Sequence, residues 1–123
     1  MRFTFKKEEK LKSKILIDQL FVEGKRIKSF PILLTYAKVK HTSNYKIQAG
    51  FSVPKRRFKR AVDRNRIKRL LRESYRLNKH LIQEKEVLDS QKYVFMFIYI
   101  SSEIIGYSEI EKAMKTILQR FVK

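Results

Sequence analysis

"KYVFMFIYIS" (Lys92–Ser101) is the stretch that decides the fold, because it is a continuous apolar run rich in strand-forming residues. A run that is apolar on both faces is typical of a strand covered on both sides by other elements. Tyr93, Phe95, Phe97 and Tyr99 share one face through the two-residue period of a strand. We interpret this aromatic face as core, and the alternative is an aromatic binding surface.

Helices are predicted on both sides of this strand. Before this strand in the sequence, helical periodicity extends from residue 58 or 59 to about residue 81. After the strand, it extends through "YSEIEKAMKTILQRFVK" (residues 107–123). Ser108 and Glu111 stand in the spacing of a capping box at the start of the downstream helix. The buried stripe of this last helix is predicted to contain Ile110, Met114, Ile117, Leu118 and Phe121.

Two further strands and one further helix are predicted toward the N-terminus. "SFPILLTYAKV" (Ser29–Val39) and "YKIQAGFSV" (Tyr45–Val53) have strand patterns and are joined by a polar turn at residues 41–44. A helix precedes them, with Ser13 as its N-cap and Gly24 as a left-handed stop. The residues alone therefore predict the order α–β–β–α–β–α, which is typical of an α+β two-layer domain.

The composition indicates a protein that binds a polyanion. The chain has 123 residues, a net charge of +18 and 43% hydrophobic residues, so we expect one domain over residues 1–123 with a real core. A compact domain this basic repels itself unless it meets nucleic acid, an anionic membrane surface or an acidic protein. The absence of cysteine excludes disulfides and thiolate metal sites. We see neither a run of the ~20 apolar residues that would span a bilayer nor a signal peptide, and we expect a cytoplasmic protein.

Positive charge is concentrated in the helix predicted before the strand at residues 92–101 and in the residues that lead into this helix. Ten of the eighteen residues from 55 to 72 are Lys or Arg, and Asp63 is the one acid among them. Placed at 100° per residue, the apolar stripe of this helix is expected to pack on the sheet. That stripe contains Ile67, Leu70, Leu71, Ser74 and Leu81, and the face predicted to lie opposite contains Arg64, Asn65, Lys68, Arg69, Arg72 and Arg76.

A solvated amphipathic face is the alternative to a binding face. Such faces usually mix charges, whereas basic residues here recur at i, i+4 and i+8 and repel each other. Arginine predominates, and its planar fork suits phosphates and base edges. The helix also lacks the exposed apolar face that would enter lipid. These features favour nucleic acid over a membrane.

"AGFSVPKRRFKRAVDRNRIKRLLRESYR" (Ala49–Arg76) closely resembles the signature of the bacterial ribonuclease P protein subunit, with "RNR" at residues 64–66 as its centre. The resemblance extends over "LIDQLFVEGKRIKSFPILLTYA" (residues 16–37), which looks like the first helix and strand of that family. The run at 92–101 and the last helix fit the family's final β–α pair. The resemblance implies an α–β–β–β–α–β–α fold with a left-handed βαβ crossover.

The resemblance also implies a function. Family members assemble with a catalytic RNA, and this ribonucleoprotein endonuclease removes the 5′ leader of precursor tRNA, with Mg²⁺ on the RNA activating the water. We therefore expect ribonuclease P RNA and precursor tRNA as partners, and no membrane, obligate protein partner, catalytic residue or cofactor on the protein. The resemblance places the RNA-subunit contact on Lys55, Arg56, Arg57, Arg60, Arg64, Asn65, Arg66, Lys68, Arg69 and Arg72. It places the leader in a cleft between the first helix and the sheet, lined by Ile17, Phe21, Tyr36, Phe51, Val53 and Lys55.

Several observations bear on the alternatives to these assignments. Phe21 and Tyr36 suit stacking against single-stranded bases, although both residue types are common in a core. Ile17 stands where some relatives have an aromatic residue, and "PKRRFKRA" (residues 54–61) is one residue longer than the shorter family form. A plain RNA-binding module is the main rival function, but the run at 92–101 lacks the glycine of an RRM strand. A DNA-binding helix protein would show a helix-turn-helix pairing, which is not evident.

Overall fold

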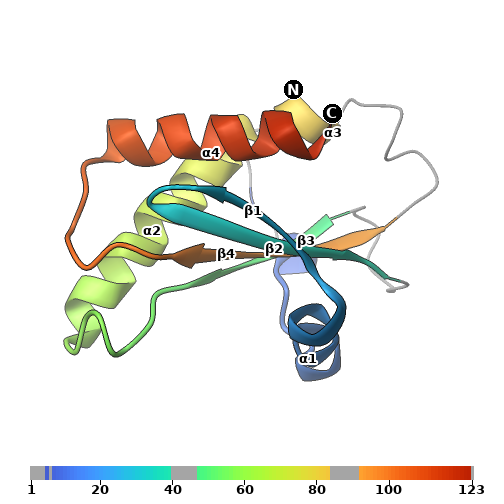
Figure 1. The fold of residues 1–123 in the computed structure, drawn as a ribbon, viewed down its shortest axis with the longest axis horizontal. Coiled ribbons are helices and arrows are strands. Elements are labelled where there is room, and N and C mark those ends of the chain that lie inside the picture. The colour runs from blue at the N-terminus through green and yellow to red at the C-terminus, as the bar shows by residue number, and fades with distance from the viewer. Residues whose placement is uncertain (1–4, 6, 40–46, 84–91, 123) are drawn as a thin grey trace.

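The fold is a four-stranded sheet with helices on both faces, described by a computed structural model for residues 5, 7–39, 47–83 and 92–122 (Figure 1). The strand order is β1-β2-β4-β3, with β1/β2 and β2/β4 antiparallel and β3/β4 parallel. The predicted α+β class with a mostly antiparallel sheet is therefore confirmed. The elements are η1 (Lys7–Glu9), α1 (Lys14–Glu23), β1 (Lys25–Ser29), β2 (Ile32–Lys38), β3 (Ile47–Ser52), α2 (Ala61–Asn78), α3 (His80–Gln83), β4 (Tyr93–Tyr99) and α4 (Tyr107–Phe121).

The two sheet faces have separate cores. Residues of α2 and α4, such as Ile67 and Ile117, pack with Phe95 and Phe97 of β4 on one face, which we call the α4 face. On the other face, the α1 face, the smaller cluster contains Leu11, Leu20, Val39, Val94 and Met96. Figure 1 shows α4 above the sheet and α1 below it, so α1 adds a partial layer to the two predicted layers.

Strand β4 occupies the centre of this arrangement. It lies between β2 and β3, and Phe95, Phe97 and Tyr99 are fully buried on the α4 face. The interpretation of its aromatic face as core is confirmed for these three residues, whereas Tyr93 at the start of the strand is half-buried. The chain passes from β3 through α2 to the parallel neighbour β4, which is the crossover that the family resemblance implies. Its left hand stays a prediction.

Strand β1 is the element that the reading of the residues missed. The predicted single strand over Ser29–Val39 is wrong at its start, because Ser29 ends β1 and a turn with a cis Phe30–Pro31 peptide precedes β2. Only Ile27 among the residues of β1 is apolar and contacts the core. An edge strand of this kind gives little hydrophobic signal, because its charged side chains stay in water.

The predicted caps of α1 agree with the structure at the start of the helix but not at its end. Ser13 is the N-cap of α1 as expected, and its Oγ accepts from the Leu16 N–H at 3.3 Å. Gly24, however, has φ −69° and is extended rather than left-handed. A Cβ there would lie 2.7 Å from Thr35 Cγ2, so glycine lets the end of α1 pass close to β2.

The predicted capping box of α4 is also wrong. Gly106 is the N-cap and provides no side-chain cap, while Ser108 already lies within the helix. Glu111 instead accepts from the Tyr107 hydroxyl and from the Asn78 side-chain amide, both at 3.2 Å. Its carboxylate therefore joins α4 to the C-terminal end of α2 instead of capping its own helix.

The basic helix is shorter than predicted. Residues 55–57 form a turn in which the Arg57 N–H donates to the Pro54 carbonyl at 3.2 Å, so α2 begins only at Ala61. It ends at Asn78, and the remaining predicted length forms the separate short helix α3. The predicted stripe is buried at Ile67, Leu71 and Ser74, and it also includes Tyr75 and Asn78.

Candidate nucleic-acid interface

The exposed side of α2 and the loop before it form a surface dense in positive charge. Among the residues predicted to contact the RNA subunit, most are exposed, and none of these forms an ion pair with a described residue. We call them, together with Lys59, the α2 basic surface: Lys55, Arg56, Lys59, Arg60, Asn65, Arg66, Arg69 and Arg72. Unpaired guanidinium groups on one face can each donate two parallel hydrogen bonds to a phosphate.

Arg64 does not lie with this surface. It precedes Ile67 by three residues and Leu71 by seven, so it flanks the buried stripe and not the face opposite. Its Nη1 donates to the carbonyls of Phe58 and Lys59, both at 2.8 Å. Arg64 thus fastens the loop that carries Lys55–Arg60 to the first turns of α2. Lys68, one turn later, is likewise only half exposed.

Arg57 also has a contact within the protein. Its Nη1 donates to Ser102 Oγ at 3.1 Å, across 45 residues of sequence, and its Nε is buried without an acceptor in the described part of the chain. The side chain is half-buried, in contrast to the exposed Lys55 and Arg56 beside it. Arg57 therefore joins the basic loop to the connection between β4 and α4.

Arg76, at the C-terminal end of α2, forms an ion pair with Glu73, unlike the residues of the α2 basic surface, which form none with a described residue. Its Nε and Nη2 donate to the two carboxylate oxygens of Glu73 at 2.6 and 3.0 Å. The hydrogen bond from Arg76 holds the pKa of Glu73 below its ordinary value. Positive charge beyond Arg72 is thus partly compensated within the protein, whereas the N-terminal half of α2 has no such carboxylate pair among the described residues.

Three of the residues predicted to line the leader cleft lie on the face of the sheet opposite α1. Ile17 packs against the cluster on the α1 face, and Phe21 of the same helix is 50% exposed. Tyr36, Phe51 and Val53 instead belong to the α4 face. Tyr36 packs edge-on against Phe121 of α4 at a centroid distance of 5.1 Å, and Phe51 stacks on Phe97 at 5.6 Å. The sheet therefore separates these three residues from α1.

Different side chains lie on the α1 face beyond the part that α1 covers. Leu33 pairs with Ile98, and Ile98 pairs with Ser52, so the three are neighbours across β2, β4 and β3. All three are half-buried. At the β1 edge, Arg26 and Lys28 alternate with the core residue Ile27 and are therefore on the α1 face. This face combines an apolar floor with a basic edge, and sequence reasoning missed it because both faces of β2 are apolar.

Other kinds of site find little support in the residues that the structure describes. No group of three or more His, Cys, Asp or Glu side chains suited to a metal ion occurs there. No described helix is both long and apolar enough to cross a membrane. The cationic surfaces are thus the main chemical feature of the described chain.

Comparisons with known proteins agree with this picture. The family described as Ribonuclease P matches residues 5–122. The ribonuclease P protein component of Porphyromonas gingivalis is 38% identical over 123 residues, which cover 96% of this chain and 86% of the relative. The ribonuclease P protein of Thermotoga maritima has a TM-score of 0.71 at 21% identity, covering 91% of this chain and 96% of that one. That of Staphylococcus aureus has a TM-score of 0.69 at 17% identity, covering 92% and 94%. The chain therefore belongs to the bacterial ribonuclease P protein family, whose members are tRNA-processing components.

Proposed function

We propose that this chain binds ribonuclease P RNA and the 5′ leader of precursor tRNA, and so assists the removal of that leader. The α2 basic surface is the observation that carries the proposal. It presents exposed arginines such as Arg66, Arg69 and Arg72 without ion-pair partners in the described chain. Folding leaves this charge uncompensated, and an RNA backbone would neutralise it.

We place the RNA subunit on the α2 basic surface. Arg64 and Arg57 contribute there as positioning residues, because they hold the Lys55–Arg60 loop through contacts within the protein. The loop and the first turns of α2 then present their charges as one rigid surface. Rigid presentation lowers the conformational entropy that is lost when phosphates bind.

We place the leader on the α1 face. Ile17 and Phe21 of α1 remain in this proposal, whereas Leu33, Ser52 and Ile98 replace Tyr36, Phe51 and Val53 as its floor. Lys55 follows β3 by a few residues and adds charge at the end of this floor. Single-stranded nucleic acid is typically bound by such a groove, in which bases lie on apolar or aromatic side chains and the backbone meets cations.

The protein's part in the reaction is binding and positioning. We assign cleavage to the RNA subunit, where magnesium ions would activate the attacking water, and we expect no cofactor on the protein. We expect the ribonucleoprotein to work in the cytoplasm. In this proposal the protein raises the affinity of the complex for leader-bearing substrate, because that is the substrate that reaches the α1 face.

Processing of precursor tRNA tests this function. A bacterial ribonuclease P RNA is assayed at low magnesium with and without the protein, and the metal-washed protein is assayed alone. We expect 5′ cleavage to be restored only when both components are present. A protein that binds the RNA without raising processing would be a plain RNA-binding module, and cleavage by the RNA-free protein would refute the assignment of chemistry to the RNA.

A further inference from the structure

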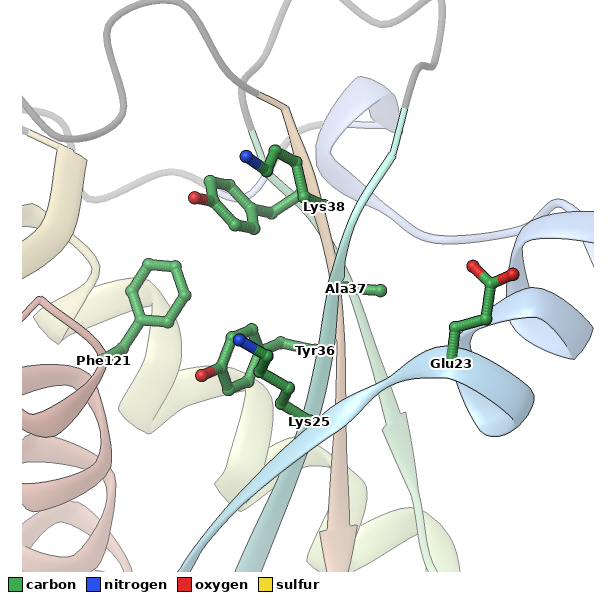
Figure 2. A pocket seen from close by; sticks show the side chains of 7 residues that line it. Glu23, Lys25, Tyr36, Ala37, Lys38 and Phe121 are labelled. Atoms are coloured by element: carbon green, nitrogen blue, oxygen red, sulfur yellow. The ribbon is translucent and has the colours of Figure 1, made fainter.

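A pocket lies at the end of β2 where the last residue of α4 meets the sheet (Figure 2). It is lined on the α4 face by Lys25, Tyr36, Lys38, Tyr93 and Phe121, and on the other side of β2 by Glu23 and Ala37. It has a volume of about 370 Å³, within the range of roughly 300–1,000 Å³ that is usual for small-ligand pockets. Phe121 lines it, and the centroid of its ring lies 5.1 Å from that of Tyr36 and 5.2 Å from that of Tyr93. Phe95 packs behind Phe121 at 4.9 Å and fixes the ring against the core. The pocket thus has a rigid aromatic wall that is only half-buried.

Two lysines frame this wall. Lys25 pairs with Tyr36 across β1 and β2, and Lys38 pairs with Tyr93 across β2 and β4. Figure 2 shows Lys25, Lys38, Tyr36 and Phe121 on one side of β2. Neither lysine forms an ion pair with a described residue. The carboxylate of Glu23 lies on the other side of the strand and accepts from the Gln19 amide at 3.2 Å.

We propose that this pocket binds one unpaired nucleotide of single-stranded RNA, with the base against the aromatic wall and the phosphate between Lys25 and Lys38. An aromatic wall beside two unpaired ammonium groups matches a flat ring that carries an anion. The C-terminal end of α4 has the negative end of its helix dipole, so the phosphate lies on the lysine side of the pocket. An acidic peptide would satisfy the lysines and leave the aromatic wall without a planar partner.

This inference rests on the proposed function, because it takes RNA as the ligand of the protein. It goes beyond that function because the aromatic wall and both lysines lie on the α4 face, across the sheet from the floor where we place the leader, although Glu23 and Ala37 extend the lining of the pocket to the α1 side. The pocket therefore gives the protein a contact with RNA on a further side of the molecule. Its occupant is an unpaired base of the RNA subunit or of the substrate.

The pocket is tested by NMR titration of the isotope-labelled free protein with 5′-AMP, adenosine and inorganic phosphate in parallel. We expect AMP to shift the signals of Tyr36, Lys38 and Phe121, and to bind more tightly than either of its two parts. Lys25→Gln combined with Lys38→Gln should weaken AMP binding about 10-fold, the loss expected from removing charge-assisted contacts to a phosphate. Phe121→Leu, which keeps the apolar volume, should remove the advantage of AMP over phosphate.

The matched control is Lys112→Gln combined with Lys115→Gln, which makes the same charge change on the exposed side of α4. We expect this control to leave AMP affinity within about 2-fold, since screening limits distant surface charges. Equal weakening by both double variants, AMP shifts confined to α1 or α2, or equal affinity for AMP and phosphate would overturn the inference. Tighter binding of oligoglutamate than of AMP at the same residues would also overturn it.

The proposed function has a separate readout. If wild-type protein restores tRNA processing but AMP does not reach the pocket, only the pocket inference fails. If AMP binds the pocket but wild-type protein does not support processing, the proposed function fails and the nucleotide site stands. Lys25→Gln with Lys38→Gln, assayed in the reconstituted complex, should weaken RNA affinity while the matched control does not, and unchanged affinity would contradict an RNA occupant.

Discussion

The two arginines of the Arg64–Asn65–Arg66 motif have different tasks. Arg64 donates to two loop carbonyls, whereas Arg66 is exposed and forms no ion pair with a described residue. We expect Arg64→Ala to lower the free energy of unfolding by about 1.5–3 kcal/mol, because hydrogen bonds from a charged donor are lost. Arg66→Ala should change it by no more than ~0.5 kcal/mol, as is usual for an exposed side chain.

Urea denaturation of the free variants measures this difference. Binding to ribonuclease P RNA should weaken in both, in Arg64→Ala because the loop loosens and in Arg66→Ala because a phosphate contact is lost. Arg64→Lys serves as a control, since it keeps the charge but lacks the planar group that reaches two carbonyls. Equal stability of Arg64→Ala and wild type would show that the loop does not depend on this side chain.

Phe21 is the residue best suited to test whether the leader binds on the α1 face. Because its side chain is 50% exposed, Phe21→Ala should affect stability little while removing a surface for stacking. We expect the preference of the reconstituted complex for leader-bearing over leaderless tRNA to fall by ~1–3 kcal/mol, the contribution of one stacked base. Val22→Ala is the matched control, since Val22 is 83% exposed on the same helix. A uniform loss of affinity for both substrates would place Phe21 outside the leader site.

The face of the sheet on which Tyr36 lies could not be predicted from the sequence. In β2 both alternating sets are apolar, with Ile32, Leu34 and Tyr36 in one and Leu33 and Ala37 in the other. A strand apolar on both faces gives no sign of which set faces α1, and a shift of one residue exchanges the faces. The structure places Leu33, not Tyr36, on the α1 face, because Tyr36 packs on Phe95 and Phe121.

At the scale of elements, η1 is fixed to the end of α2 by a buried ion pair. Lys79 Nζ lies 2.5 Å from Glu9 Oε1, and both residues are only 2% exposed. Glu9→Leu should destabilise the protein by about 3–5 kcal/mol, because it leaves a buried ammonium without its carboxylate. Thermal and urea unfolding of the variant measure this loss.

The double variant Glu9→Leu with Lys79→Met is the control for that prediction. Replacing both charges by apolar groups removes the desolvated ion and its partner together, so most of the lost stability should return. A double variant as unstable as Glu9→Leu alone would mean that the packing of η1, rather than the ion pair, holds the segment. Phe5, which packs on Phe51 and Tyr75, is the residue that would then carry that role.

Elements with a strong local pattern were predicted well, and those that depend on distant partners were not. Helix α2 follows from its periodic apolar stripe, whose buried residues pack in one core, and strand β4 follows from its continuous apolar run, which packs in a core on each face of the sheet. The contact of Glu9 with Lys79 joins residues 70 positions apart, so no local sequence pattern predicts it. The prediction of a capping box was wrong for a related reason, since the Glu111 carboxylate accepts a hydrogen bond from Asn78 of another helix.

At the scale of the whole molecule, basic residues greatly outnumber acidic ones. The chain has 30 Lys and Arg against 12 Asp and Glu. Glu9, Glu73 and Glu111 pair with Lys79, Arg76 and Lys115, and these pairs lie outside the α2 basic surface. The charged residues of the α2 basic surface are exposed and form no ion pair with a described residue, so their charge is available to RNA. This distribution predicts strong electrostatic control of binding.

Salt dependence of RNA affinity measures that control. If the α2 basic surface neutralises ~6–8 phosphates, the plot of log K against log salt should have a slope of roughly −4 to −7. The triple variant Arg66→Gln, Arg69→Gln, Arg72→Gln should make the slope less negative by roughly 2 to 3, because each lost charge leaves a counterion on the RNA. Lys112→Gln with Lys115→Gln should leave the slope near the wild-type value. A triple variant with lower affinity but an unchanged slope would show that these arginines act through folding or base contacts and not through phosphates.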